Sequence, residues 1–123
     1  MIAILFVDDH EVLAQLSCEI LEMQGYRAVC ASSGTQALEK LDQEDFDLLV
    51  TDFRMEGMNG VELARKAHET NPALPVIIVT GYAPVDGGKD VKCCLQKENL
   101  FPGLLEEIKS LLHERELAAA KTA

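Results

Sequence analysis

Acidic and hydroxyl side chains stand where apolar, strand-like runs of this chain end. Asp8 and Asp9 follow the first such run, Asp52 closes another, and Thr80 follows a third. A carboxylate at the end of a buried strand raises the free energy of the fold unless a partner offsets its charge. In an open parallel sheet, ligands bind outside the carboxyl ends of the strands. The sequence therefore predicts one cleft with three carboxylates and one hydroxyl, and a binding partner for them.

Strand-like and helix-like patterns alternate along the chain. Strands are predicted at residues 2–7, 27–31, 47–51, 75–79 and 91–96. Helices are predicted at residues 10–24, from a capping box that starts at Ser33, and at 60–70 after the capping residue Asn59. A last helix is predicted over a final apolar stripe of Phe101, Leu104, Leu105, Ile108, Leu111 and Leu112. Five successive βα units imply a doubly wound α/β fold, in which a five-stranded parallel sheet lies between helices with right-handed crossovers.

The fourth helix of this pattern is the irregular place. Between Thr80 and Lys97, Pro84 and the pair Gly87 and Gly88 disfavour helix, so at most a short turn fits there. The sequence as a whole predicts a single domain over residues 1–123 without an internal linker. The tail at 118–123 is expected to fray.

The composition argues against several classes of function. A formal net charge of −10 opposes contact with nucleic acid or an anionic membrane, because phosphate groups select basic surfaces. The four cysteines lack the spacing of a metal site, and we interpret them as reduced core residues of a cytosolic protein. No signal peptide precedes the first strand and no apolar run approaches membrane-spanning length, so a cytoplasmic location is expected.

The acidic positions and their neighbours resemble the CheY-like receiver domain of bacterial two-component response regulators. The resemblance covers nearly the whole chain and is carried by Phe6-Val7-Asp8-Asp9-His10, Val50-Thr51-Asp52-Phe53-Arg54-Met55, Met58-Asn59-Gly60, Ile78-Val79-Thr80-Gly81 and Lys97. One acidic pair is a weak signal, whereas the full set at the ends of the correct strands is specific. The resemblance implies the flavodoxin-like version of the fold and a part in phosphorelay signal transduction.

The resemblance implies that Asp52 is the phosphoacceptor and attacks the phosphorus of a phosphohistidine on a sensor histidine kinase or phosphotransfer protein. It also implies that Asp8, Asp9 and Asp52 bind one Mg²⁺ together with the backbone carbonyl of Arg54, since Mg²⁺ favours hard oxygen ligands. Such a domain catalyses only its own aspartyl phosphorylation and dephosphorylation, so we expect a signalling protein and not an enzyme.

Three further positions are implied to act on the phosphoryl group. Lys97 would pair with one phosphoryl oxygen as a compact cation. Thr80 would donate a hydrogen bond to another and move inward with its loop, so that phosphorylation biases a two-state element. Arg54, two residues past Asp52, is expected to tune the hydrolysis of the acyl phosphate.

The chain departs from the family pattern beside both Asp52 and Lys97. Glu56 and Glu98 stand where the family usually has proline. We expect Glu56 to face solvent. Without proline the Lys97–Glu98 peptide should be trans, which leaves the aim of Lys97 open.

Two more departures affect the switch and its output. Cys94 occupies the position of the aromatic or histidine side chain that reports the movement of the switch threonine, and a small side chain cannot transmit that movement in the same way. Tyr82 either takes over this role or is a partly exposed loop aromatic. The shortened segment 81–90 also alters the family's usual output face, so a monomer or weak dimer is expected.

Simpler interpretations exist for each residue taken alone. Asp8 and Asp9 could cap the first helix, Asp52 could be a solvated strand end, Thr80 a strand former and Lys97 a surface lysine. All of these must hold together to replace the receiver interpretation.

Two other classes of function compete with a phosphoacceptor receiver. The first is a phosphorylation-independent interaction module, which Cys94, Glu98 and the shortened helix favour. The second is a phosphatase of the haloacid dehalogenase type, which would need an acidic residue where Arg54 stands. Output is expected to pass through a downstream protein or a missing output domain. Whether the chain is free-standing or cut from a larger hybrid kinase or regulator stays open.

Overall fold

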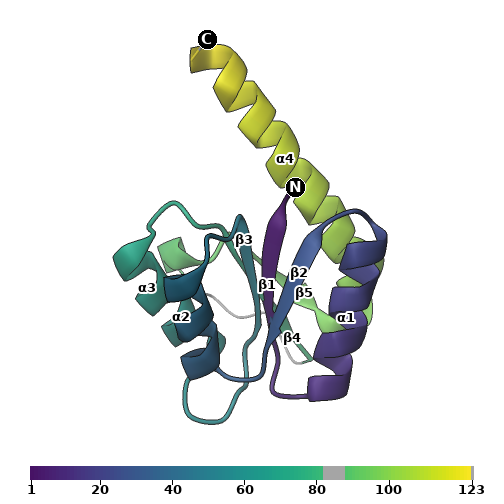
Figure 1. The fold of residues 1–123 in the computed structure, drawn as a ribbon, viewed down its shortest axis with the longest axis vertical. Coiled ribbons are helices and arrows are strands. Elements are labelled where there is room, and N and C mark those ends of the chain that lie inside the picture. Colours follow the sequence, from purple (N-terminus) through teal and green to yellow (C-terminus); the bar gives the residue numbers. More distant parts are fainter. Residues whose placement is uncertain (82–87, 123) are drawn as a thin grey trace.

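Five parallel strands form the centre of the molecule, and helices cover both faces of the sheet (Figure 1). The computed structural model of the chain describes residues 1–81 and 88–122. The strands are β1 (Ala3–Val7), β2 (Arg27–Ala31), β3 (Leu48–Asp52), β4 (Val76–Thr80) and β5 (Cys93–Gln96). They pair in the order β2-β1-β3-β4-β5, and every pair is parallel. The predicted doubly wound α/β fold is confirmed.

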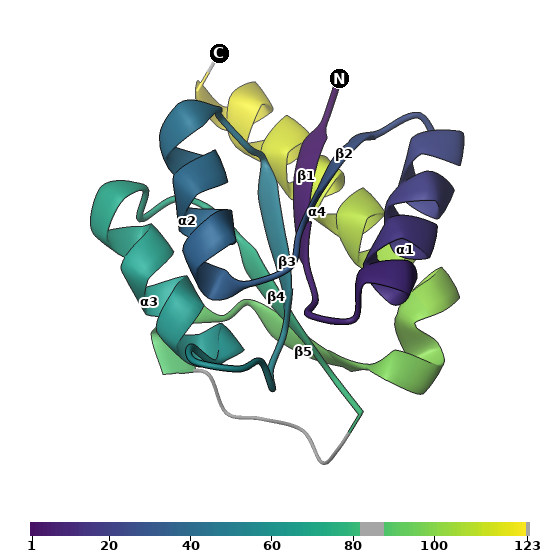
Figure 2. The same ribbon diagram turned by 60° about the horizontal axis from the view of Figure 1, so that its bottom comes forward.

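The helices divide into two layers (Figures 1 and 2). On one face lie α1 (Glu11–Met23) and α4 (Leu100–Thr122), and on the other lie α2 (Gly34–Gln43) and α3 (Gly60–Thr70). Two helices begin at the predicted polar caps: the Ser33 hydroxyl accepts a hydrogen bond from the Gln36 amide, and the Asn59 side chain accepts one from the Glu62 amide.

The central strands are buried on both faces, which is why they read as unbroken apolar runs. In β1, Leu5 and Val7 pack toward α2 and α3, whereas Ile4 and Phe6 pack toward α1 and α4. β1, β3 and β4 are buried along their whole length. Such strands have little freedom to shift, so the residues at their carboxyl ends are held in fixed positions.

The last helix follows the predicted apolar stripe. Leu104 and Ile108 are almost fully buried against the sheet, and the other stripe residues pack around them. Phe101 has an extended backbone, so the regular part of α4 begins at Pro102, where proline suits the first helical turn. None of the helices in the described part of the chain is long and apolar enough to cross a membrane.

The sequence predicted a frayed tail from Ala118, whereas the structure continues the helix to Thr122 and away from the body of the molecule (Figure 1). Alanine is the strongest helix former, which explains a helix there without an apolar stripe. Fraying of these residues in solution stays a prediction.

Between β4 and β5, the described residues form a short 3₁₀ turn, η1 (Gly88–Asp90). It agrees with the predicted lack of a full fourth helix, while Tyr82 and Pro84 lie outside the described residues. His68 of α3 holds η1 in place. Its Nδ1 lies 2.8 Å from Asp90 Oδ1, and its Nε2 lies 2.6 Å from the Leu74 carbonyl oxygen.

Candidate functional site

Three carboxylates meet at the carboxyl edge of the sheet, as the sequence predicted. Asp8 and Asp9 follow β1, Asp52 is the last residue of β3, and β1 and β3 are neighbours. One oxygen from each carboxylate lies within 4.8 Å of one from the other two. Asp8 is only 2% exposed and Asp52 only 6%, whereas Asp9 is open to solvent. Two of the three negative charges are therefore withdrawn from water.

Lys97 brings a positive charge to this cluster. It begins a 3₁₀ turn, η2 (Lys97–Asn99), directly after β5. Its Nζ lies 3.1 Å from Asp52 Oδ2 and 3.7 Å from Asp8 Oδ2. Among the described residues the only cis peptide bond is Phe101–Pro102, so the Lys97–Glu98 bond is trans, as predicted. Lys97 reaches the carboxylates with Glu98, and not a proline, as the next residue.

The cluster brings three carboxylates together with one lysine, and the pKa values of Asp52 and Lys97 both rise in this environment. Burial raises the pKa of Asp52, and repulsion from Asp8 and Asp9 adds to this, while the hydrogen bond from Lys97 opposes it without reversing it. Burial lowers the pKa of Lys97, but its hydrogen bond to Asp52 and the three negative charges outweigh burial and raise it. The site therefore retains an excess of negative charge that a further cation would relieve.

The predicted switch residue lies at the same edge of the sheet. Thr80 is the last residue of β4 and is 1% exposed, and its pairing partner in β5 is Gln96. Cys94 is half-buried in β5 opposite Ile78. Tyr82, the other predicted switch position, lies outside the described residues.

Two charged side chains shortly after Asp52 point into solvent. Arg54 and Glu56 are both exposed, so Glu56 faces solvent as expected. The exposed position of Arg54, two residues after Asp52, is compatible with a guanidinium group that reaches over the site.

Sequence reasoning missed the close approach of Gly60 to β3. The Gly60 amide donates a 2.9 Å hydrogen bond to the Phe53 carbonyl. A Cβ atom at Gly60 would lie 2.6 Å from the backbone oxygen of Asp52, closer than such contacts occur. The contact joins α3 to a strand that lies earlier in the chain, and the residues around Gly60 predicted only the start of a helix.

The cap of α1 is His10, and not Asp8 or Asp9 as the simpler interpretation supposed. His10 Nδ1 accepts a 3.2 Å hydrogen bond from the Leu13 amide. Asp8 stabilises the turn that precedes α1, because its Oδ1 accepts a 2.9 Å hydrogen bond from the His10 amide. Its other oxygen, Oδ2, lies on the side of Lys97.

Asp52→Asn is expected to make the metal-free protein more stable than the wild type at pH 7. The raised pKa of Asp52 means that its ionised form is disfavoured in the folded state. Ionised Asp52 therefore lowers the stability of the wild type, and this loss is complete at pH values above the pKa of Asp52 in the folded state. The loss disappears as the pH falls through that pKa toward the lower pKa of Asp52 in the unfolded state. Thermal unfolding of both proteins in chelator, from pH 7 to pH 4, measures it. A less stable Asp52→Asn protein at pH 7 would contradict the prediction, and the exposed Asp45→Asn is the matched control.

A family model described as the response regulator receiver domain matches residues 4–96. The chain is 36% identical over 115 residues to the response regulator receiver protein CpdR of Brucella abortus, a match that covers 89% of this chain and 95% of CpdR. It is 35% identical over 114 residues to the sensor protein EvgS of Escherichia coli (strain K12), covering 92% of this chain but only 10% of EvgS.

Solved structures give the same result. The response regulator TrrA of Thermotoga maritima, in complex with Mg²⁺-BeF, has a TM-score of 0.83 and 30% identity, and the match covers 90% of this chain and 99% of TrrA. TrrA in complex with the histidine kinase ThkA has a TM-score of 0.82 and 30% identity, with 91% of this chain and 99% of that chain covered.

Proposed function

This chain belongs to the response regulator receiver domain family, a family of signalling domains, and we propose that it accepts a phosphoryl group from a sensor histidine kinase or a phosphotransfer protein onto Asp52. The observation that carries the proposal is the cluster itself. An oxygen of Asp52 lies within 4.8 Å of a carboxylate oxygen of Asp8 and of one of Asp9. Asp52 Oδ2 also lies 3.1 Å from Lys97 Nζ. TrrA, which is similar over most of the chain, has been solved with a histidine kinase.

Asp52 is the nucleophile of the proposed reaction. One of its carboxylate oxygens forms a bond to the donor's phosphorus while the bond from phosphorus to the donor histidine nitrogen breaks, and that nitrogen keeps the electron pair. Lys97 Nζ, already 3.1 Å from Asp52 Oδ2, is placed to pair with a phosphoryl oxygen. The Thr80 hydroxyl, at the end of the next strand, would donate a hydrogen bond to another phosphoryl oxygen.

The acidic cluster fits a magnesium ion. Three carboxylates on one edge of the sheet are hard oxygen donors, and the repulsion among them is only partly offset by Lys97. We propose that Asp8, Asp9, Asp52 and the backbone carbonyl of Arg54 hold Mg²⁺. When bound, the ion would offset the repulsion between these carboxylates and an anionic phosphoryl group. The Mg²⁺-BeF complex of TrrA supports this assignment.

An exposed apolar patch beside the site suits a docking partner. Val12 and Leu16 of α1 are 61% and 52% exposed, and they lie one helical turn apart. α1 begins directly after the acidic pair, so a protein that covers these two residues would lie close to Asp52. We propose that the phosphodonor protein uses this patch.

The relatives leave two contexts open for such a domain. The chain matches 95% of CpdR but only 10% of EvgS, so a free-standing regulator and a segment of a larger protein both fit. In either context we propose that a downstream protein or an output domain outside this chain receives the signal. A monomeric or weakly dimeric state stays a prediction.

The direct test is the mass of the intact protein after incubation with acetyl phosphate and Mg²⁺. The wild-type protein is expected to gain one phosphoryl group, and both a chelator and the Asp52→Asn substitution should prevent it. If the wild type gains no phosphoryl group from acetyl phosphate or from a histidine kinase, while it still binds Mg²⁺, the proposal is wrong. That result would favour an interaction module that works without phosphorylation.

Arg54→Ala is expected to change the lifetime of the acyl phosphate more than the yield of phosphorylation. Arg54 lies exposed two residues past Asp52, and we propose that its guanidinium group acts on the hydrolysis of the acyl phosphate. The decay of the phosphorylated protein after removal of the donor gives its lifetime. Arg65→Ala, which removes an exposed arginine on α3, is the control. An unchanged decay rate would exclude this role for Arg54.

A further inference from the structure

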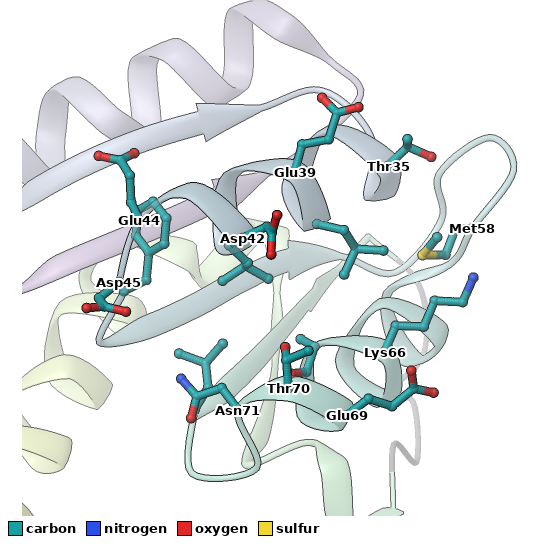
Figure 3. Close-up of a pocket in the computed structure, with 15 residues that line it drawn as sticks. Thr35, Glu39, Asp42, Glu44, Asp45, Met58, Lys66, Glu69, Thr70 and Asn71 are labelled. Atoms are coloured by element: carbon teal, nitrogen blue, oxygen red, sulfur yellow. The ribbon is translucent and has the colours of Figure 1, made fainter.

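A second surface of the molecule has the features of a binding site. A groove of about 840 Å³ runs between α2 and α3, on the face of the sheet opposite α1 and α4 (Figure 3). None of the carboxylates of the phosphorylation site lines it. Met58 marks one end, in the loop that connects Asp52 to α3.

The floor of the groove is apolar. Phe46 and Leu74 are buried beneath it, and Leu38, Leu41 and Met58 are half-buried members of the same core cluster. The apolar surface that these three side chains leave open is available to a partner, since burying it would release water from the groove.

The rim of the groove is strongly acidic. Exposed carboxylates stand on both walls, with Glu39 and Asp42 on α2 and Glu69 on α3, and Asp45 lies at the far end (Figure 3). Glu44 is paired with Arg27. Among the lining residues, all of which the structure describes, Lys66 is the only lysine or arginine. A cleft lined by one sign of charge concentrates counter-charge, so this groove favours a basic occupant.

The length of the groove favours a helix over a compact ligand. Its lining residues begin at Thr35 near the start of α2 and continue past the end of that helix to Phe46. At 1.5 Å per residue, the ten residues of α2 span roughly 15 Å, or nearly three helical turns. An amphipathic helix that lies along such a groove places apolar side chains on the floor and basic side chains at the two rims.

We propose that this groove between α2 and α3 binds a basic amphipathic helix of a partner protein. The acidic walls exclude nucleic acid, and the net charge of −10 makes a second copy of this chain an unfavourable occupant. The interaction is independent of the phosphorylation site, so it is expected whether or not Asp52 accepts a phosphoryl group.

The test measures the affinity of a fluorescein-labelled amphipathic helix made of leucine and lysine, about three to four helical turns long. Fluorescence polarisation with the unphosphorylated wild-type protein should give saturable binding that weakens as salt is added. The triple substitution Glu39→Lys, Asp42→Lys and Glu69→Lys should weaken binding about tenfold or more. All three residues are exposed, and circular dichroism checks that the variant is folded.

A matched control separates the groove from general attraction to an acidic protein. Glu19→Lys, Glu22→Lys and Glu106→Lys change the net charge equally at exposed positions on α1 and α4, and they should leave the affinity within about twofold of the wild type. Equal weakening by both triple variants would overturn the proposal. So would equal binding of a peptide that keeps the lysines but has serine in place of leucine.

Two further outcomes would assign the groove differently. Amide chemical shift changes confined to residues outside α2, α3 and the other lining residues, Glu44, Asp45, Phe46, Met58, Asn71 and Leu74, would place the peptide elsewhere and overturn the proposal. The wild-type protein could instead self-associate, and the triple substitution of Glu39, Asp42 and Glu69 could abolish this association. That result would assign the groove to a second copy of the chain and overturn the proposal.

Discussion

Asp8→Asn is expected to weaken Mg²⁺ binding about 100-fold. Asp8 is 2% exposed and contributes one of the three clustered carboxylates, so its negative charge acts on the site with little screening by water. Asparagine has nearly the same shape and keeps an oxygen that accepts the hydrogen bond from the His10 amide. The change therefore removes charge while it preserves the turn that leads into α1.

Isothermal titration calorimetry with Mg²⁺ measures this loss directly. Thermal unfolding offers a second readout, because ligand that binds only the folded state stabilises it, by about 2.7 kcal/mol at a concentration 100 times Kd. Mg²⁺ should therefore raise the Tm of the wild type far more than that of the variant. Asp42→Asn, at an exposed position outside the cluster, is the control. Equal Mg²⁺ affinities for wild type and Asp8→Asn would show that the cluster is not the metal site.

Gly60→Ala is expected to destabilise the protein by about 2 kcal/mol, which corresponds to a fall in Tm of roughly 8 °C. The added Cβ would lie 2.6 Å from the Asp52 backbone oxygen and 3.2 Å from Thr51 Cγ2. Both belong to the buried strand β3, so neither can move aside without disturbing the core. The same displacement should slow phosphorylation of Asp52, because the acceptor carboxylate would shift relative to Lys97.

Gly103→Ala provides the matched control for this substitution. Gly103 lies in α4, and a Cβ there would make an ordinary contact of 3.8 Å with Leu95. Alanine is also the better helix former, so this variant should be neutral or up to about 0.5 kcal/mol more stable. Chemical denaturation of the two variants and the wild type makes the comparison. Equal free energies of unfolding for all three proteins would show that the backbone accommodates a Cβ atom at position 60 without loss of stability.

The fold could be read from the sequence because its signals are local. A strand buried on both faces must be apolar throughout, and a helix that covers a sheet must repeat its apolar residues every three to four positions. These patterns predicted the five strands to within two residues of their observed ends, and they predicted α3 at its observed bounds. The capping side chains of Ser33 and Asn59 are local too, and both make the predicted hydrogen bonds.

The acidic site was predictable for a related reason. Once the strands are parallel, their carboxyl ends share one edge, so Asp8, Asp9 and Asp52 must lie near one another. The sequence left the aim of Lys97 open, and only the structure shows its Nζ 3.1 Å from Asp52 Oδ2. That distance depends on how β5 pairs with β4 and on the turn that follows, and neither is encoded in the residues around Lys97.

Other features were decided by packing between elements far apart in the sequence. His68 is a helix residue by local pattern, and only the approach of η1 to α3 gives it Asp90 as a partner. The acidic groove likewise exists because α2 and α3 lie side by side on one face of the sheet. The sequence by itself determined the class of fold and the strand-end carboxylates, since both follow from local periodicity and chain direction. Tertiary structure decided the reach of Lys97, the contact at Gly60 and the groove, because each depends on the distance between separate elements.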